Sequence, residues 1–121
     1  MIKMIGLLKR KPGMKKEEFR EYYETNHRVI GEKYLKGYAC KYMRRYPESR
    51  PERGTGRVLE PDFDVILEIW YPDQESLEAS NQNLATPEIA AEIAADEEQL
   101  FDRTQMRFYF LDEEVSDIDS E

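Results

Sequence analysis

A single histidine is the side chain in this sequence best suited to acid–base chemistry. His27 is the only histidine, and it follows Phe19 by eight residues and Tyr23 by four. This helical spacing places His27 on the apolar, inward side of a helix. An imidazole with its ordinary pKa of about 6.5 can both accept and donate a proton near neutral pH. The alternative is a core histidine that is hydrogen-bonded to a carboxylate or to a backbone carbonyl.

Tyrosine and arginine side chains of an expected strand form the second group of candidates. Tyr38, Tyr42 and Tyr46 recur with a period of two, so their rings share one face and could line a wall for a flat ligand. Packing at a subunit interface is the alternative for these rings. Arg44 and Arg45 point to opposite faces, and an inward Arg44 favours a carboxylate or enolate ligand. Ion pairing is the alternative for both arginines.

Asp64 and Trp70 belong to the strongest strand pattern, DFDVILEIWY at residues 62–71. An unpaired Asp64 is costly in a dry core, so its carboxylate needs a partner. We expect Asp64 to orient the His27 ring if helix and strand bring the two together, with an ion pair to an arginine of the preceding strand as the alternative. The alternation puts Trp70 on the same face as Asp64, where it is a candidate for ligand binding or for an interface.

The order of predicted elements is β-α-β-β-α-β. Gly37 is suited to end the first helix, Asp73 and Thr86 to begin the later ones. The segment at 47–61 is rich in Pro, Gly and charge and predicts an irregular, mobile loop that could cover an opening. The expected strands are 2–10, 38–46, 62–71 and 104–111, and the first helix is 15–34.

This order predicts an α+β fold, the ferredoxin-like plait, in which helices cover one face of a four-stranded antiparallel sheet. Apolar residues on both sides of the strand at 62–71 indicate that the other face is also covered. A second copy of the chain is the simplest cover, which predicts a homodimer. We expect one domain over residues 1–112 and a solvated acidic tail over 113–121.

Composition and charge exclude several classes of partner. Residues 1–59 hold 16 Lys and Arg against 7 Asp and Glu, and residues 60–121 hold 2 against 19, so the halves carry +9 and −17. This asymmetry favours pairing between halves or subunits over nucleic-acid binding. No run is long enough for a membrane span, which with the lone Cys40 predicts a cytoplasmic protein with no membrane partner. We expect Cys40 to be buried.

The sequence contains no pattern for a metal ion or a nucleotide cofactor. One histidine and one cysteine leave no recognised metal-ligand spacing. The glycines at 54 and 56 lack the strand-to-helix context of a phosphate loop. We therefore expect no cofactor and no metal.

Three segments together resemble the EthD-like family of the dimeric α/β-barrel superfamily. They are LLKRKPGMKKEEFREYYETNH, KYMRRY and DFDVILEIWYPDQESLEA, in the family's order and spacing. The resemblance implies two subunits whose sheets pack face to face, with one cavity per subunit. It matches His27 to the histidine of the family's first helix and Asp64 to the aspartate near its third strand.

Related branches include muconolactone-type isomerases, polyketide cyclases and dehydratases, and cofactor-free oxygenases. Two departures stand out: Val29 replaces a common proline, and Met14 replaces a Ser or Thr helix cap. Loss of the proline lets the helix continue past His27.

The residues and the resemblance together predict a cofactor-independent lyase, dehydratase or isomerase that acts on a small aromatic, polyketide-like or lactone substrate. His27 is the expected general acid/base. A non-catalytic carrier of a hydrophobic metabolite and a haem-binding barrel are the alternatives. The expected site residues are His27 and Asp64 for catalysis, and Tyr23, Tyr38, Tyr42, Arg44 and Trp70 for substrate.

Overall fold

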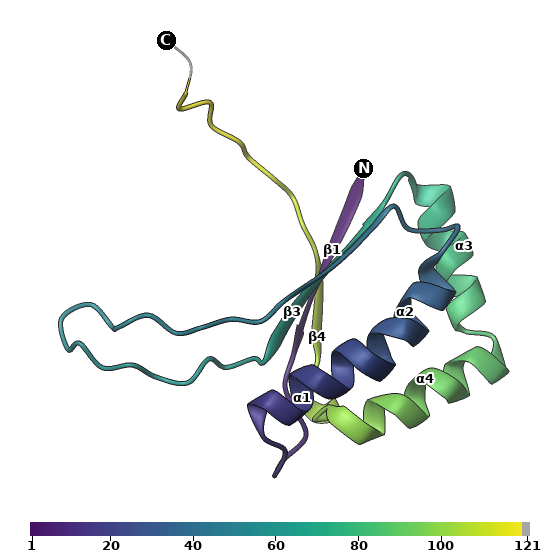
Figure 1. Cartoon of the computed structure of the whole chain (residues 1–121). Helices are drawn as coiled ribbons and strands as arrows, with labels where there is room; N and C mark the ends of the chain where they lie inside the picture. The colour runs from purple at the N-terminus through teal and green to yellow at the C-terminus, as the bar shows by residue number, and fades with distance from the viewer. Residues whose placement is uncertain (120–121) are drawn as a thin grey trace.

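A computed structural model describes residues 1–119, in which four antiparallel strands form one sheet with all helices on one side (Figure 1). The order across the sheet is β2-β3-β1-β4. This confirms the predicted plait. The strands are β1 (Ile2–Leu8), β2 (Lys41–Arg45), β3 (Val65–Tyr71) and β4 (Arg107–Phe110).

The first helical segment runs without a break from residue 16 to residue 35 but changes its winding in the middle. It comprises α1 (Lys16–Tyr22), a π-helical turn η1 (Tyr23–His27) and α2 (Arg28–Leu35). The backbone N–H of Arg28 bonds to the Tyr23 carbonyl, five residues back. The helix continues past His27, and Gly37 follows with a left-handed φ of 89°.

The second helical segment consists of two helices and a short turn. α3 (Gln74–Leu84) begins as predicted, because the Asp73 side chain accepts a hydrogen bond from the Ser76 backbone N–H at 2.8 Å. α4 (Pro87–Leu100) has Pro87 at its first position. A 3₁₀ turn, η2 (Arg103–Gln105), leads into β4.

The core lies between the sheet and the helices. In β3, Val65, Leu67, Ile69 and Tyr71 are buried and face the helices, while the residues between them are partly exposed. This is the predicted alternation. Phe19 from α1 and Leu100 from α4 complete the same cluster.

The chain between β2 and β3 forms an arm that leaves the sheet on the side away from the helices (Figure 1). We call residues 47–61 the β2–β3 arm. Its tip is closed by its own bonds, since the Glu52 N–H donates to the Arg57 carbonyl at 2.7 Å and the Gly56 N–H to the Glu52 carbonyl at 2.9 Å. Val58 and Leu59 on the arm are exposed. The tip of the arm therefore lies away from the helices (Figure 1).

Several expectations about single residues and boundaries were wrong. Cys40 is exposed, because it lies outside the sheet in the turn that precedes β2. The strands are shorter than predicted, so Tyr38 and Tyr46 flank β2 rather than belong to it.

The described part of the expected tail, residues 113–119, is exposed. Lys3 Nζ lies 2.9 Å from Glu113 Oε2, and residues 120 and 121 lie outside the described part.

Candidate active site

A cavity of about 190 Å³ opens between the helices and the inner face of the sheet. Its wall is mainly apolar and combines residues of β1, β3, α2 and α4. The polar groups on the wall are few: His27, Glu97 and Asn81, together with the hydroxyls of several tyrosines. Sparse polar groups in an apolar hollow are typical of a site for a small organic ligand.

His27 reaches this cavity from the π-helical turn. Its ring is held between two aromatic neighbours, with centroids 5.0 Å from Tyr23 and 5.1 Å from Phe101, both edge-on. The side chain is 12% exposed. π-helical turns inside longer helices often accompany functional sites, because the extra residue changes which side chains share a face.

Asp96 holds the other side of the His27 ring. His27 Nδ1 lies 2.8 Å from Asp96 Oδ2, and the Tyr22 hydroxyl donates to Asp96 Oδ1 at 2.6 Å. A carboxylate can only accept, so Nδ1 carries the proton in the neutral ring and Nε2 keeps its lone pair. No described residue forms a hydrogen bond with Nε2. A ring held in this way can accept a proton at Nε2.

Asp96 was not predicted, although the sequence carries a signal for it. It follows Ile93 by three residues and precedes Leu100 by four, so it lies on the apolar stripe of α4. A carboxylate on such a stripe needs a partner from another element.

A buried tyrosine, Tyr23, and a partly buried one, Tyr42, meet at the wall of the cavity. The hydroxyls of Tyr23 and Tyr42 lie 2.7 Å apart. Burial raises the pKa of Tyr42 to about 12 and that of Tyr23 well above its usual value, so both remain protonated at neutral pH. Two hydroxyls that share one hydrogen bond still have one hydrogen to donate. The pair can therefore stabilise an oxygen that becomes negative.

Glu97 is the acidic side chain of the wall. It is 20% exposed, and burial raises its pKa, although His27 and Arg103 act in the opposite direction. Neighbouring Asp96 raises it further. Glu97 lies four residues after Ile93, which places it on the same side of α4.

Arg44 points toward the helices, yet it does not line the cavity. Glu24 Oε2 accepts from Arg44 Nε at 3.0 Å and Glu24 Oε1 from Nη2 at 2.8 Å, so the pair is bidentate. The Tyr46 hydroxyl donates to Glu24 at 2.6 Å. The positive charge of Arg44 is therefore already paired with Glu24 and is not free for a ligand.

These bonds predict a loss of stability in acid. Hydrogen bonds from Arg44, opposed in part by burial, lower the pKa of Glu24 from 4.5 to about 2. A lowered folded-state pKa means that the stabilisation is present above pH 4.5 and disappears as the pH falls toward 2. Because the side chain is 33% exposed, we expect only about 1 kcal/mol. Urea unfolding at pH 7 and pH 3 measures the free energy of unfolding of the wild type and of Glu24→Gln. The difference between the two proteins should be smaller at pH 3 than at pH 7. Glu21→Gln, a control at an exposed position, should not differ from the wild type at either pH.

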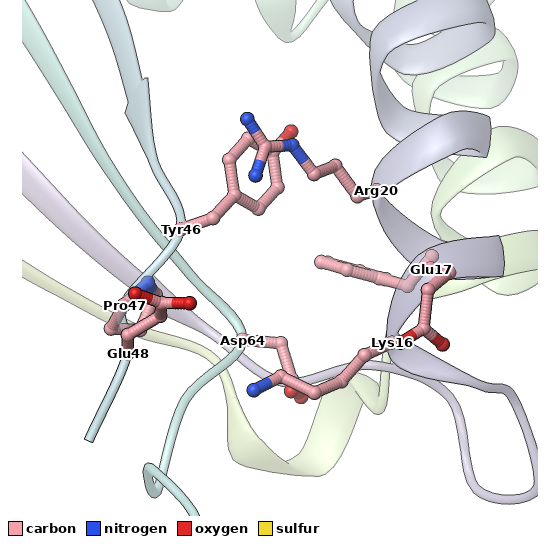
Figure 2. A pocket seen from close by; sticks show the side chains of 8 residues that line it. Lys16, Glu17, Arg20, Tyr46, Pro47, Glu48 and Asp64 are labelled. Atoms are coloured by element: carbon pink, nitrogen blue, oxygen red, sulfur yellow. The ribbon is translucent and has the colours of Figure 1, made fainter.

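The structure places Asp64 in a different hollow from His27. This hollow has a volume of about 220 Å³ and lies beside α1 and the base of the arm. Figure 2 shows Arg20 and Lys16 reaching across it toward Tyr46 and Asp64. Asp64 accepts from the Arg10 side chain at 2.6 Å and from the Arg10 backbone N–H at 2.8 Å. Asp64 thus joins the segment after β1 to the start of β3.

The remaining two candidates also lie outside the cavity wall. Tyr38 is half-buried and packs against the core. Trp70 lies on the outer face of β3, where Lys3 Nζ and Lys41 Nζ are 4.1 Å and 4.4 Å from its ring centroid. Strand alternation places Trp70 opposite the buried residues, and Asp64 precedes the strand, so the two do not share a face. Of the expected site residues, the cavity wall brings together His27, Tyr23 and Tyr42.

Comparison with known proteins identifies the family. The model of the EthD domain matches residues 11–104, which is most of the chain. The protein belongs to the EthD family. No curated protein matches the chain.

Solved structures share the fold of this EthD protein at low sequence identity. An EthD family protein from Bacillus halodurans has a TM-score of 0.61 at 22% identity, with 94% of this chain and 100% of that chain covered. A protein from Arabidopsis thaliana has a TM-score of 0.60 at 13% identity, covering 98% and 100%. A NIPSNAP-like domain protein from Burkholderia xenovorans has a TM-score of 0.57 at 18% identity, covering 99% and 88%.

Two further findings concern the described part of the EthD chain. No helix within residues 1–119 is both long and apolar enough to cross a membrane. The same residues contain no group of three or more His, Cys, Asp or Glu side chains placed to hold a metal ion.

Proposed function

We propose that this EthD protein is a cytoplasmic, cofactor-independent lyase, dehydratase or isomerase for a small aromatic, polyketide-like or lactone substrate. The observation that carries the proposal is the setting of His27, which lines the cavity while its Nδ1 is bonded to Asp96 and its Nε2 has no hydrogen-bond partner among the described residues. His27 removes a proton next to a carbonyl group and returns it at another position.

The tyrosine pair supplies the second requirement of this chemistry. When a C–H bond next to a carbonyl is broken, negative charge moves to the carbonyl oxygen. A prepositioned hydroxyl donor in a water-poor site stabilises that charge more than bulk water does. The joined hydroxyls of Tyr23 and Tyr42 have the free hydrogen for this role. Asp96 positions the imidazole through the contact with Nδ1.

A probe reaction tests the proposal without knowledge of the substrate. A base that removes the ring proton of 5-nitrobenzisoxazole breaks its N–O bond and releases a coloured nitrophenolate. A base positioned in an apolar cavity should accelerate this reaction roughly 10²-fold or more over free imidazole at the same concentration and pH. Absorbance measurements give the rate. Binding of the probe without acceleration would favour the carrier alternative.

The haem alternative receives no support from the lining of the cavity. None of the described lining residues is Lys or Arg, the side chains that would pair with haem propionates. Titration with haemin at stoichiometric concentration would reveal binding by a shift of the Soret band.

We also propose a homodimer that packs through the outer face of the sheet. On this face Trp70 is surrounded by Lys3, Lys41 and Glu68, and Ile66 extends the apolar part. The β2–β3 arm leaves on the same side (Figure 1), and Val58 and Leu59 within it are exposed. Light scattering should give twice the mass of the chain for the wild type. Ile66→Asp should shift the mass toward that of the monomer, and Gln82→Asp, at an exposed position of α3 on the helical side, should not.

A further inference from the structure

The charges around the cavity restrict the class of ligand that it can hold. Among the described lining residues there is no Lys or Arg, and the two ionisable groups other than tyrosine are His27 and Glu97. The His27 ring is already paired with the carboxylate of Asp96 at 2.8 Å. A carboxylate ligand would therefore find no uncommitted cation on the wall.

Arg44 is the cation that could have paired with a carboxylate ligand, but its guanidinium group is already bonded to another residue. Both oxygens of Glu24 bond to its guanidinium group, at 3.0 Å and 2.8 Å. Arg103 is engaged by two acids, with Nε 4.0 Å from Glu97 Oε1 and Nη1 3.2 Å from Glu98 Oε1. Neither arginine belongs to the cavity wall.

Glu97 adds an unfavourable interaction for anions. Its side chain lines the cavity at 20% exposure. The charged and titratable groups that face it are Asp96 on α4, His27 on η1 and Arg103 on η2. A carboxylate that loses water in this apolar hollow would gain no hydrogen-bonded cation in return.

We propose that the cavity selects an uncharged carbonyl compound and excludes carboxylates, with Glu97 as the residue that sets this specificity. The inference deepens the proposed function by naming its substrate class as neutral ketones, aldehydes or lactones. A ketone oxygen can accept the free hydrogen of the Tyr23–Tyr42 pair. The aromatic or aliphatic part of such a ligand lies against the apolar wall.

Matched probes of one shape and different charge test this specificity. The set is 2-acetylnaphthalene, 2-naphthoate and 2-naphthylmethylammonium, and isothermal titration calorimetry at pH 7 measures each dissociation constant on the full chain. We expect the ketone to bind roughly tenfold or more tightly than the carboxylate. Equal or tighter binding of the carboxylate would overturn the proposal, as would tighter binding of the amine or the failure of all three to bind.

A pair of neighbouring substitutions assigns the selectivity to Glu97. Glu97→Gln removes the acidic group from the wall, so naphthoate should gain affinity relative to the ketone. Glu98→Gln makes the same change of charge at a side chain that is 64% exposed and should leave the ratio unchanged. An unchanged ratio in Glu97→Gln would overturn the role of Glu97. If that variant fails to fold, the preference of the wild type still decides the ligand class.

Binding and catalysis can fail independently in these experiments. A protein that prefers the ketone but does not accelerate the deprotonation of 5-nitrobenzisoxazole keeps the inferred specificity and loses the proposed reaction. A protein that accelerates the reaction and binds naphthoate as well as the ketone keeps the reaction and loses the specificity.

Discussion

Replacing His27 with Gln should lower the rate of probe deprotonation by roughly 10²–10⁴-fold, the usual contribution of a positioned general base. Glutamine has a similar length and can still donate a hydrogen bond to Asp96, but it has no lone pair that accepts a proton at neutral pH. The aromatic contacts of the ring with Tyr23 and Phe101 are lost as well. The measurement is the initial rate of nitrophenolate release at saturating probe.

Two controls separate the loss of the base from the loss of the fold. Far-ultraviolet circular dichroism and the melting temperature should show that His27→Gln still folds. Glu98→Gln, which changes an exposed acid on the neighbouring helix, should keep the wild-type rate. The rate of Asp96→Asn should lie between those of His27→Gln and Glu98→Gln, because this substitution leaves the base in place but removes the carboxylate that orients it. If His27→Gln kept the wild-type rate, His27 would not be the base, and another group would have to remove the proton.

Replacing Phe19 with Ala should reduce the free energy of unfolding by about 3–5 kcal/mol. Phe19 is 1% exposed and contacts Tyr23 and Phe101, with ring centroids 6.2 Å and 5.8 Å away. Both neighbours also contact the His27 ring. The substitution therefore leaves a cavity under the wall that positions the histidine, and urea denaturation at a fixed protein concentration measures the cost.

The same helical segment provides a matched control. Val29 is 49% exposed, so Val29→Ala should change the free energy of unfolding by less than about 0.5 kcal/mol. A small effect of Phe19→Ala, similar to that of Val29→Ala, would contradict the assignment of Phe19 to the centre of the core. Both variants are compared at one protein concentration, so that concentration does not contribute to the difference between them.

Local patterns in the sequence predicted the order of elements and the inner face of β3. The alternation from Val65 to Tyr71 and the cap at Asp73 depend on neighbours in the chain, so they can be read without the fold. The inward position of His27 follows from the same periodicity. The π-helical turn was not predicted, because it depends on a five-residue hydrogen bond that no residue pattern specifies.

Which charged side chains meet was decided by tertiary structure. His27 pairs with Asp96 across 69 positions, Asp64 with Arg10 across 54, and Arg44 with Glu24 across 20. A strand or helix pattern fixes the face on which a side chain lies, but the partner on that face depends on how the elements are placed and wound. The sequence therefore determined that a histidine faces the interior, and only the packing of α4 against η1 determined which carboxylate holds it.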